Sequence, residues 1–186
     1  FAKKNKGNFI LRIDDTDIER SKDYYIELIK QDLQWLNLDW SKTFKQSERK
    51  KIYNKKIEEL KSSGRLYPCF ESQEELLLKR KSLLSSGKPP IYDRSSMKLS
   101  ENEKEKYLAK GIKPHWRFFI NEKKIYWNDL IRGEVSFESE NLSDPVLIRE
   151  DGSLLYHLPS VIDDISENIT HIIRGEDHIS NTAFHI

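Results

Sequence analysis

Apolar and polar positions follow two patterns along the first third of the chain, and each pattern predicts an element. Residues 8–13 form a short apolar run rich in β-forming side chains, bounded by a glycine and by acidic residues, which is typical of a strand. Apolar residues three or four apart then predict a helix after Ser21 and a second helix over 48–63, capped by Ser47 and ended by Gly64. The side chains expected on the buried faces of these helices are Tyr25, Ile26, Ile29, Leu33 and Leu36, and Ile52, Tyr53, Ile57 and Leu60. A strand followed by helices at this spacing predicts a βαβ unit with a parallel sheet.

The pattern changes after Pro68. Two Ser-x-x-Glu boxes, at Ser72 and Ser100, predict helices over 73–85 and 101–110, because each serine can cap the helix that its glutamate supports. The two prolines within 87–96 exclude regular helix there. Four short β-rich runs follow between residues 115 and 149, namely HWRFFIN, KIYW, EVSFES and VLIR. Asp151-Gly152 between apolar runs indicates a hairpin.

Apolar runs lengthen again from residue 154. The β-branched run 169–174 (ITHIIR) has no clean alternation, which predicts a strand covered on both faces, and Ser180 is expected to cap a final helix. The fold class is therefore α/β: a parallel-sheet domain interrupted by an α+β insertion over about 68–153.

Charge and composition exclude several classes of protein. The 186 residues carry 32 basic and 31 acidic side chains and a net charge of +1, which excludes a uniformly basic nucleic-acid binder. Cys69 is the single cysteine, so an internal disulfide and an all-cysteine zinc site are excluded and a reducing, cytoplasmic location is expected. No apolar stretch is long enough to predict a membrane span or a signal peptide. Because the chain begins at Phe1, we expect it to be a piece of a longer protein.

Three carboxylates follow the first predicted strand. Asp14, Asp15 and Asp17 lie at its carboxyl end, where open α/β sheets place ligands. Asp14 and Asp15 should not share a target, because successive side chains of an extended segment point in opposite directions. The alternative to ligand contact is that Asp15 or Asp17 caps the following helix.

An arginine ends the apolar run 169–174. Arg174 is costly there unless it is paired with an anion, and its planar guanidinium suits a carboxylate or a phosphate. The alternative is a structural ion pair with Asp163, Glu176 or Asp177. Three histidines recur every seven residues, which is not a metal-ligand spacing and favours surface or packing roles, namely His171, His178 and His185.

Other candidates have weaker support. Tyr156 lies in an apolar stretch, where core packing is the default interpretation. Asp163 and Asp164 could cap a helix, bind a metal or remain solvated. No glycine-rich phosphate loop and no Ser/His/Asp motif is present. The chemistry of the residues alone indicates an α/β ligand-binding domain with acidic and arginine-bearing strand ends.

Eight segments in series resemble one family. The chain is similar to the glutamyl-tRNA synthetases, a class I aminoacyl-tRNA synthetase family, in the segments GNFILRIDDTDIERS, LQWLNLDW, QSERKKIY, GRLYPCF, PPIYD, NDLIRGEVSF, VLIREDGSLLYHL and ITHIIRGEDHISNT. The resemblance implies a Rossmann-like catalytic domain, over 1–67 and 154–186, split by an acceptor-stem-binding insertion over 68–153.

The resemblance also implies roles for individual residues. Asp14 matches the acidic residue that holds the α-amino group of glutamate, Arg174 matches the arginine that binds its side-chain carboxylate, and Tyr156 and Ser160 line the same pocket. Asp177 matches an acidic residue near ATP. The positions that match the surroundings of the tRNA acceptor end are Thr16, Asp17, Arg20 and Arg132. No residue of this chain is expected to be catalytic.

This sequence differs from the family's pattern in two ways that bear on its activity and on metal binding. The family's His-Ile-Gly-His signature would lie upstream of Phe1 and its Lys-Met-Ser-Lys-Ser-type loop downstream of Ile186, so we expect these 186 residues to be inactive alone. Some relatives bind zinc through three cysteines, but here Glu71 and Ser96 replace the second and third, so no zinc and no other bound metal is expected.

The implied parent enzyme is a monomer that uses ATP with Mg²⁺, L-glutamate and the acceptor stem of tRNA-Glu. Three alternatives are a paralogue that glutamylates a queuosine-type base of tRNA, a metal-dependent phosphohydrolase built on the aspartates, and a non-catalytic RNA-binding module.

Overall fold

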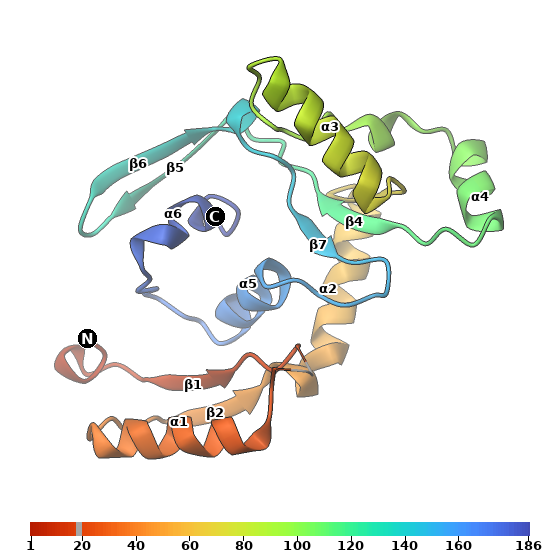
Figure 1. The fold of residues 1–186 in the computed structure, drawn as a ribbon. Coiled ribbons are helices and arrows are strands. Elements are labelled where there is room, and N and C mark those ends of the chain that lie inside the picture. The colour runs from red at the N-terminus through yellow and green to blue at the C-terminus, as the bar shows by residue number, and fades with distance from the viewer. Residues whose placement is uncertain (18–19) are drawn as a thin grey trace. The chain divides into compact units, whose positions relative to one another are not determined.

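A computed structural model describes residues 1–17 and 20–186, and the chain divides into two compact units, residues 1–54 and 55–186 (Figure 1). Each unit is described by itself. Ile18 and Glu19, which belong to the acidic segment singled out in the sequence, lie outside the described residues. No helix within the described ranges is both long enough and apolar enough to cross a bilayer.

The first unit is the predicted βαβ element. Strand β1 (Ile10–Ile13) pairs in parallel with β2 (Lys42–Lys45), and helix α1 (Asp23–Trp35) connects them. Leu11 and Ile13 point to one face of β1 and pack with Ile26 of α1. The sequence does not predict where β2 lies, because Phe44 is the only apolar residue in its sequence KTFK.

The first helix buries less than the sequence predicts, whereas Tyr53 and Ile57 of the second are buried as expected. Of the apolar residues assigned to α1, Ile26 is buried, whereas Tyr25, Ile29 and Leu36 are exposed, because a two-stranded sheet covers only a narrow stripe of the helix. Helix α2 (Lys50–Ser62) begins later than predicted, after a 3-10 turn over Gln46–Arg49. The predicted capping role of Ser47 is wrong, since its hydroxyl donates to Asp15 Oδ2 at 2.7 Å.

The second unit holds an antiparallel sheet and a hairpin. The sheet has the order β3–β4–β7, formed by Leu66–Cys69, His115–Phe118 and Val146–Ile148. The hairpin pairs β5 (Lys124–Asp129) with β6 (Gly133–Glu138). All four strands expected between 115 and 149 are therefore present, and the turn at Asp151-Gly152 brings Leu154 back against Ile148. Gly152 has φ of +84°, a conformation that favours glycine.

Both predicted capping boxes are confirmed. Ser72 and Glu75 exchange side-chain and backbone hydrogen bonds at the start of α3 (Gln73–Ser85), and Ser100 and Glu103 do so at α4 (Glu101–Ala109). Two further helices follow the sheet, α5 (His157–Ser166) and α6 (Ile179–Thr182).

The strand expected over 169–174 is not formed. This run connects α5 to α6 as an irregular segment in which Ile172 is 52% and Ile173 73% exposed (Figure 1). The physical reason is that a strand needs a hydrogen-bonded neighbour, and no strand of the described chain pairs with it. The capping role expected for Ser180 is also wrong, because α6 begins at Ile179 and its N-cap position is His178.

A buried carboxylate joins three parts of the second unit. Asp144 is 1% exposed and accepts hydrogen bonds from Tyr67 of β3, from the backbone N–H of Ile120 and twice from the guanidinium of Arg94. The distances to Arg94 are both 2.8 Å, which is the geometry of a strong bidentate pair. Arg94 has φ of +56°, so its backbone takes an unusual conformation to reach this site.

We expect Asp144→Asn to lower the free energy of unfolding by about 3 kcal/mol, because it leaves the Arg94 charge without its partner. Urea unfolding followed by tryptophan fluorescence measures the change. Asp151→Asn, in an exposed turn, is the matched control and should change stability by less than about 0.5 kcal/mol. Equal effects of the two substitutions would show that the Asp144 cluster does not hold the unit together.

Candidate functional site

The aspartates after β1 have separate partners. Asp14 accepts from Arg12 Nε at 2.7 Å and Nη2 at 3.2 Å. Asp15 accepts from the backbone N–H of Ser47 at 2.8 Å and from its hydroxyl. The prediction that the two carboxylates do not share a target is therefore confirmed.

Neither Asp15 nor Asp17 caps α1. Its N-cap position is Lys22, which makes no side-chain capping bond. Asp17 instead faces Arg20 in an exposed ion pair of 3.5 Å, and Thr16 is exposed beside them. The segment thus presents an acid, a hydroxyl and a guanidinium on the surface of the first unit.

Arg174 is held by side chains rather than by secondary structure. Its guanidinium Nη2 lies 2.9 Å from His185 Nδ1 and 3.9 Å from Asp164 Oδ2, and its side chain is 16% exposed. Asp164 is not among the three partners expected from the sequence. The guanidinium therefore has an imidazole at short range and a carboxylate farther away.

Tyr156 and Ser160 lie one turn apart at the start of α5. Tyr156 is 39% exposed, so the default expectation of core packing is wrong. Its ring lies near three imidazoles, those of His157, His178 and His185, at centroid distances of 5.5 to 6.0 Å. Ser160 is fully buried. Through His185, the structure brings Tyr156 and Arg174 into one cluster.

The remaining predicted residues of the second unit surround the turn after Arg174. Asp177 is exposed, and its carboxylate lies 3.8 Å from His178 Nε2. Arg132 forms an ion pair with Glu176. Arg132 lies at the tip of the β5–β6 hairpin, where Asp129 accepts its backbone N–H at 2.9 Å.

The predicted site residues thus fall into two groups. Asp14, Thr16, Asp17 and Arg20 belong to the first unit, and the others belong to the second. The convergence of Asp14 and Arg174 on one ligand stays a prediction. Sequence reasoning missed two further members of the cluster. It did not single out His157, and the seven-residue spacing of His185 with His171 and His178 suggested only surface or packing roles.

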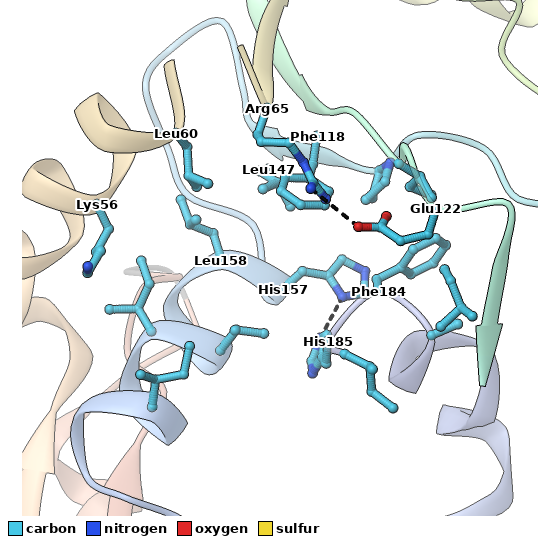
Figure 2. Close-up of a pocket in the computed structure, with 18 of the residues that line it drawn as sticks. Lys56, Leu60, Arg65, Phe118, Glu122, Leu147, His157, Leu158, Phe184 and His185 are labelled. Atoms are coloured by element: carbon cyan, nitrogen blue, oxygen red, sulfur yellow. Dashed lines mark hydrogen bonds and ion pairs between the residues drawn. The ribbon is translucent and has the colours of Figure 1, made fainter. Parts of the chain in front are cut away.

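A cavity of about 560 Å³ opens beside this cluster in the second unit (Figure 2). Its walls are mainly apolar, with Leu60, Phe118, Leu147 and Leu158 among them. Figure 2 shows the contact between His157 and His185 and, above it, the ion pair between Arg65 and Glu122, 3.3 Å long. The cavity is therefore an apolar space with two polar contacts in its wall.

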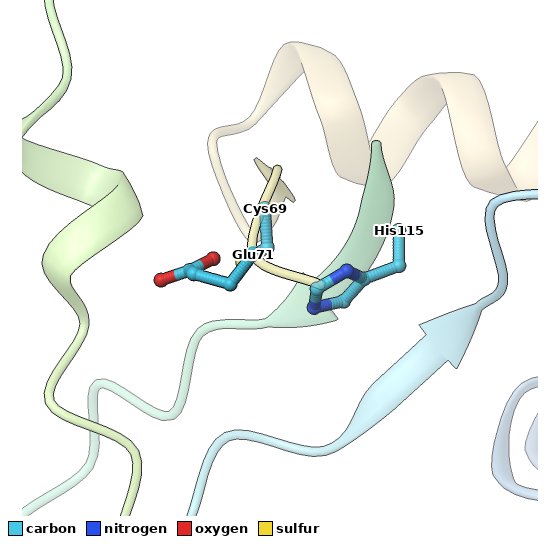
Figure 3. Close-up of side chains that lie close together, drawn as sticks. All are labelled: Cys69, Glu71 and His115. Atoms are coloured by element: carbon cyan, nitrogen blue, oxygen red, sulfur yellow. The ribbon is translucent and has the colours of Figure 1, made fainter. Parts of the chain in front are cut away.

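A second polar cluster lies at the end of β3. Ligand atoms of Cys69, Glu71 and His115 lie within 4.8 Å of one another (Figure 3). Among the described residues, the buried Nε2 of His115 has no hydrogen-bond partner. Burial raises the pKa of the Cys69 thiol to about 11, and burial with the nearby Arg117 charge lowers the pKa of His115 to about 4. Both groups are therefore neutral at pH 7.

Glu71 is the charged member of this cluster. Its Oε1 accepts from the hydroxyls of Tyr92 at 2.7 Å and Ser95 at 2.9 Å, and its Oε2 accepts from Ser96 at 2.7 Å. Burial raises the pKa of Glu71, but these hydrogen bonds outweigh it and bring the pKa to about 2.

The cluster does not fit a zinc site made of thiolates. Cys69 is the only cysteine of the cluster, and both Glu71 oxygens are already used by hydroxyl donors. Ser96, which stands at the place of a third thiolate, donates to Glu71 instead. The residues form a hydrogen-bonded cross-link between β3 and the 92–96 segment.

Comparisons with known proteins agree along the whole chain. A family model described as tRNA synthetases class I (E and Q), catalytic domain, matches residues 1–186. The proteins named glutamate–tRNA ligase 1 of Maricaulis maris and Rickettsia massiliae are 53% and 54% identical to it over 186 residues, which is all of this chain and 42% of each relative.

Solved structures show the same likeness. A glutamate tRNA ligase from Elizabethkingia meningosepticum, in complex with its amino acid, has a TM-score of 0.88 at 34% identity. The match covers all of this chain and 40% of the ligase chain. The glutamate-tRNA synthetase of Elizabethkingia anophelis has a TM-score of 0.89 at the same identity, over 41% of its chain. The chain therefore spans about two fifths of the length of these relatives.

We expect the stabilising effect of Glu71 to depend on pH. Because its pKa is lower in the folded chain than the ordinary 4.5, its contribution is complete above pH 4.5 and is lost as the pH falls towards 2. Glu71→Gln should therefore lower the free energy of unfolding by about 3 kcal/mol at pH 7 and by much less near pH 2.

Urea unfolding at several pH values measures this difference. The matched control is Glu74→Gln, an exposed carboxylate three residues away, which should change stability by less than about 1 kcal/mol throughout. A Glu71→Gln effect that is the same at pH 7 and pH 2.5 would contradict the lowered pKa.

Proposed function

Because this chain belongs to the catalytic-domain family of the class I tRNA synthetases for glutamate and glutamine, we propose that it is part of the catalytic region of a glutamate–tRNA ligase. The fold is the mixed α/β type of that family, with its parallel strand pair in the first unit. The observation that carries the proposal is Arg174, a largely shielded guanidinium beside Tyr156 and His185.

The proposed substrate has one cation and two carboxylates, so its pocket needs an acid and a fixed cation. Arg174 would bind the side-chain carboxylate through a planar pair of hydrogen bonds. Tyr156 and Ser160, one helical turn apart, would line the pocket, and Asp14 would hold the α-amino group. The exposed part of the Tyr156 ring supports contact with a ligand.

The parent reaction has two steps. The α-carboxylate of glutamate attacks the α-phosphate of ATP, and the bond to pyrophosphate breaks as glutamyl-adenylate forms. The 2′-hydroxyl of the terminal adenosine of tRNA then takes the glutamyl group, and AMP leaves. Mg²⁺ that enters with ATP would neutralise charge on the phosphates. Asp177, exposed after the Gly175 turn, would lie near the nucleotide, and no side chain of this chain becomes covalently modified.

The acceptor end of tRNA-Glu would contact both units. Arg20 and Arg132 provide exposed guanidinium groups that suit phosphates, with Thr16 and Asp17 beside Arg20. The backbone of Arg132 is fixed by the turn that Asp129 holds.

Other functions are not favoured. The named relatives are glutamate–tRNA ligases rather than queuosine-modifying paralogues or RNA-binding modules. A phosphohydrolase would need Asp14, Asp15, Asp163 and Asp164 to share a metal, but Asp14 and Asp15 are held by different protein groups.

We expect this chain to bind L-glutamate without activating it. ATP–pyrophosphate exchange should stay at background, because the groups that stabilise the α-phosphate transition state are expected outside these residues. Arg174→Ala should weaken glutamate binding, followed by NMR titration, at least tenfold. Arg149→Ala, which removes an exposed arginine, is the control. ATP–pyrophosphate exchange at the rate of a full-length relative would contradict the expected lack of activation. Unchanged glutamate binding by Arg174→Ala would contradict the proposed role of Arg174.

We also propose that the Cys69 cluster functions without zinc. Protein purified in the presence of zinc and then dialysed should contain substoichiometric metal by atomic emission, and Cys69→Ser should contain the same amount. One zinc per chain, lost on Cys69→Ser, would overturn this proposal.

A further inference from the structure

The Arg174 side chain begins in a segment without secondary structure, so its position depends on what it touches. The closest contact is Nη2 to His185 Nδ1, at 2.9 Å. His185 Nε2 in turn lies 2.9 Å from His157 Nδ1 (Figure 2). Arg174, His185 and His157 therefore form a chain of two hydrogen bonds.

The direction of both bonds follows from the first donor. A guanidinium only donates, so His185 Nδ1 accepts and its proton is on Nε2. Nε2–H then donates to His157 Nδ1, which places the His157 proton on its own Nε2. Burial and the charges of Arg174 and His178 lower the pKa of His157, which agrees with a neutral acceptor ring.

The position of His185 is fixed by the residues before it. Ala183 is 3% exposed and packs in a cluster with Ile120, Ile125 and Leu142, and Phe184 packs against the same cluster. The His185 ring also meets the His157 ring edge-on, with a centroid distance of 5.1 Å. The imidazole is thus anchored to the core of the second unit.

We propose that His185 is a positioning residue that orients the Arg174 guanidinium for the substrate carboxylate, with His157 selecting the tautomer that makes this possible. This rests on the proposed role of Arg174 in glutamate binding. A neutral acceptor at 2.9 Å orients the guanidinium without adding negative charge to that of Asp164, which lies 3.9 Å away, whereas a carboxylate in the place of His185 would compete with the substrate. The other guanidinium donors can then bind the ligand.

The tautomers test the contact directly. Long-range ¹H–¹⁵N NMR of this chain at pH 7.5 should show His185 and His157 both neutral and both protonated on Nε2. A proton on His185 Nδ1, or a doubly protonated His185, would overturn the proposal. This measurement does not depend on glutamate binding.

Three substitutions separate positioning from packing. In His185→Asn the new amide oxygen can take the place of Nδ1, so Arg174 should keep a slowly exchanging Nε–H signal and glutamate affinity should stay within about threefold. His185→Gln can reach His157 but not Arg174, and His185→Phe removes both bonds, so both should lose the signal and bind glutamate about tenfold more weakly. Thermal midpoints are recorded for all three.

The outcomes are distinct. The proposal would be overturned if glutamate affinity fell in proportion to the thermal midpoint and if His185→Asn and His185→Gln had the same affinity. That result would assign His185 a packing role. The stated tautomers and an ordered Arg174 in a chain that binds no glutamate would contradict the proposed function while establishing the positioning contact.

Discussion

The second unit depends on a buried charge at Asp144. This carboxylate accepts hydrogen bonds from the Tyr67 hydroxyl of β3, from the Arg94 guanidinium and from the backbone N–H of Ile120. Three segments that are distant in the sequence must therefore meet at one point. Removing the carboxylate is destabilising, because the partly buried Arg94 charge and the Tyr67 hydroxyl would lose their acceptor. The carboxylate therefore specifies one arrangement of the unit rather than merely adding stability.

The same constraint extends to the candidate pocket. Ile120, held by Asp144 through its backbone, packs with Ala183, and two residues later His185 contacts Arg174. A continuous set of contacts thus connects the Asp144 cluster with the guanidinium proposed to bind substrate. This explains how a residue in an irregular segment has a defined orientation.

Glu71 performs a comparable task at the other end of β3. Three hydroxyl donors keep it ionised and connect β3 to the 92–96 segment. Because a carboxylate accepts from several donors at once, it can cross-link segments that are far apart in the sequence. In the second unit, Asp144 and Glu71 each connect segments distant in the sequence through hydrogen bonds to a shielded carboxylate.

Local patterns in the chain were enough to predict α3 and α4 with their capping boxes, the strand and helix that begin the first unit, and four strands of the second, because caps, turns and periodicity act over a few residues. The eight family-like segments were also enough to identify the family. Beyond the caps assigned to Ser47 and Ser180 and the packing assigned to Tyr156, the failures that involve long-range contacts include the position of β2, the strand over 169–174 and the partners of Arg174. Each of these is decided by long-range pairing: Lys42–Lys45 is a strand because β1 lies beside it, Ile172 and Ile173 have no such neighbour among the described strands, and His185 reaches Arg174 only because Ala183 is buried in a distant cluster.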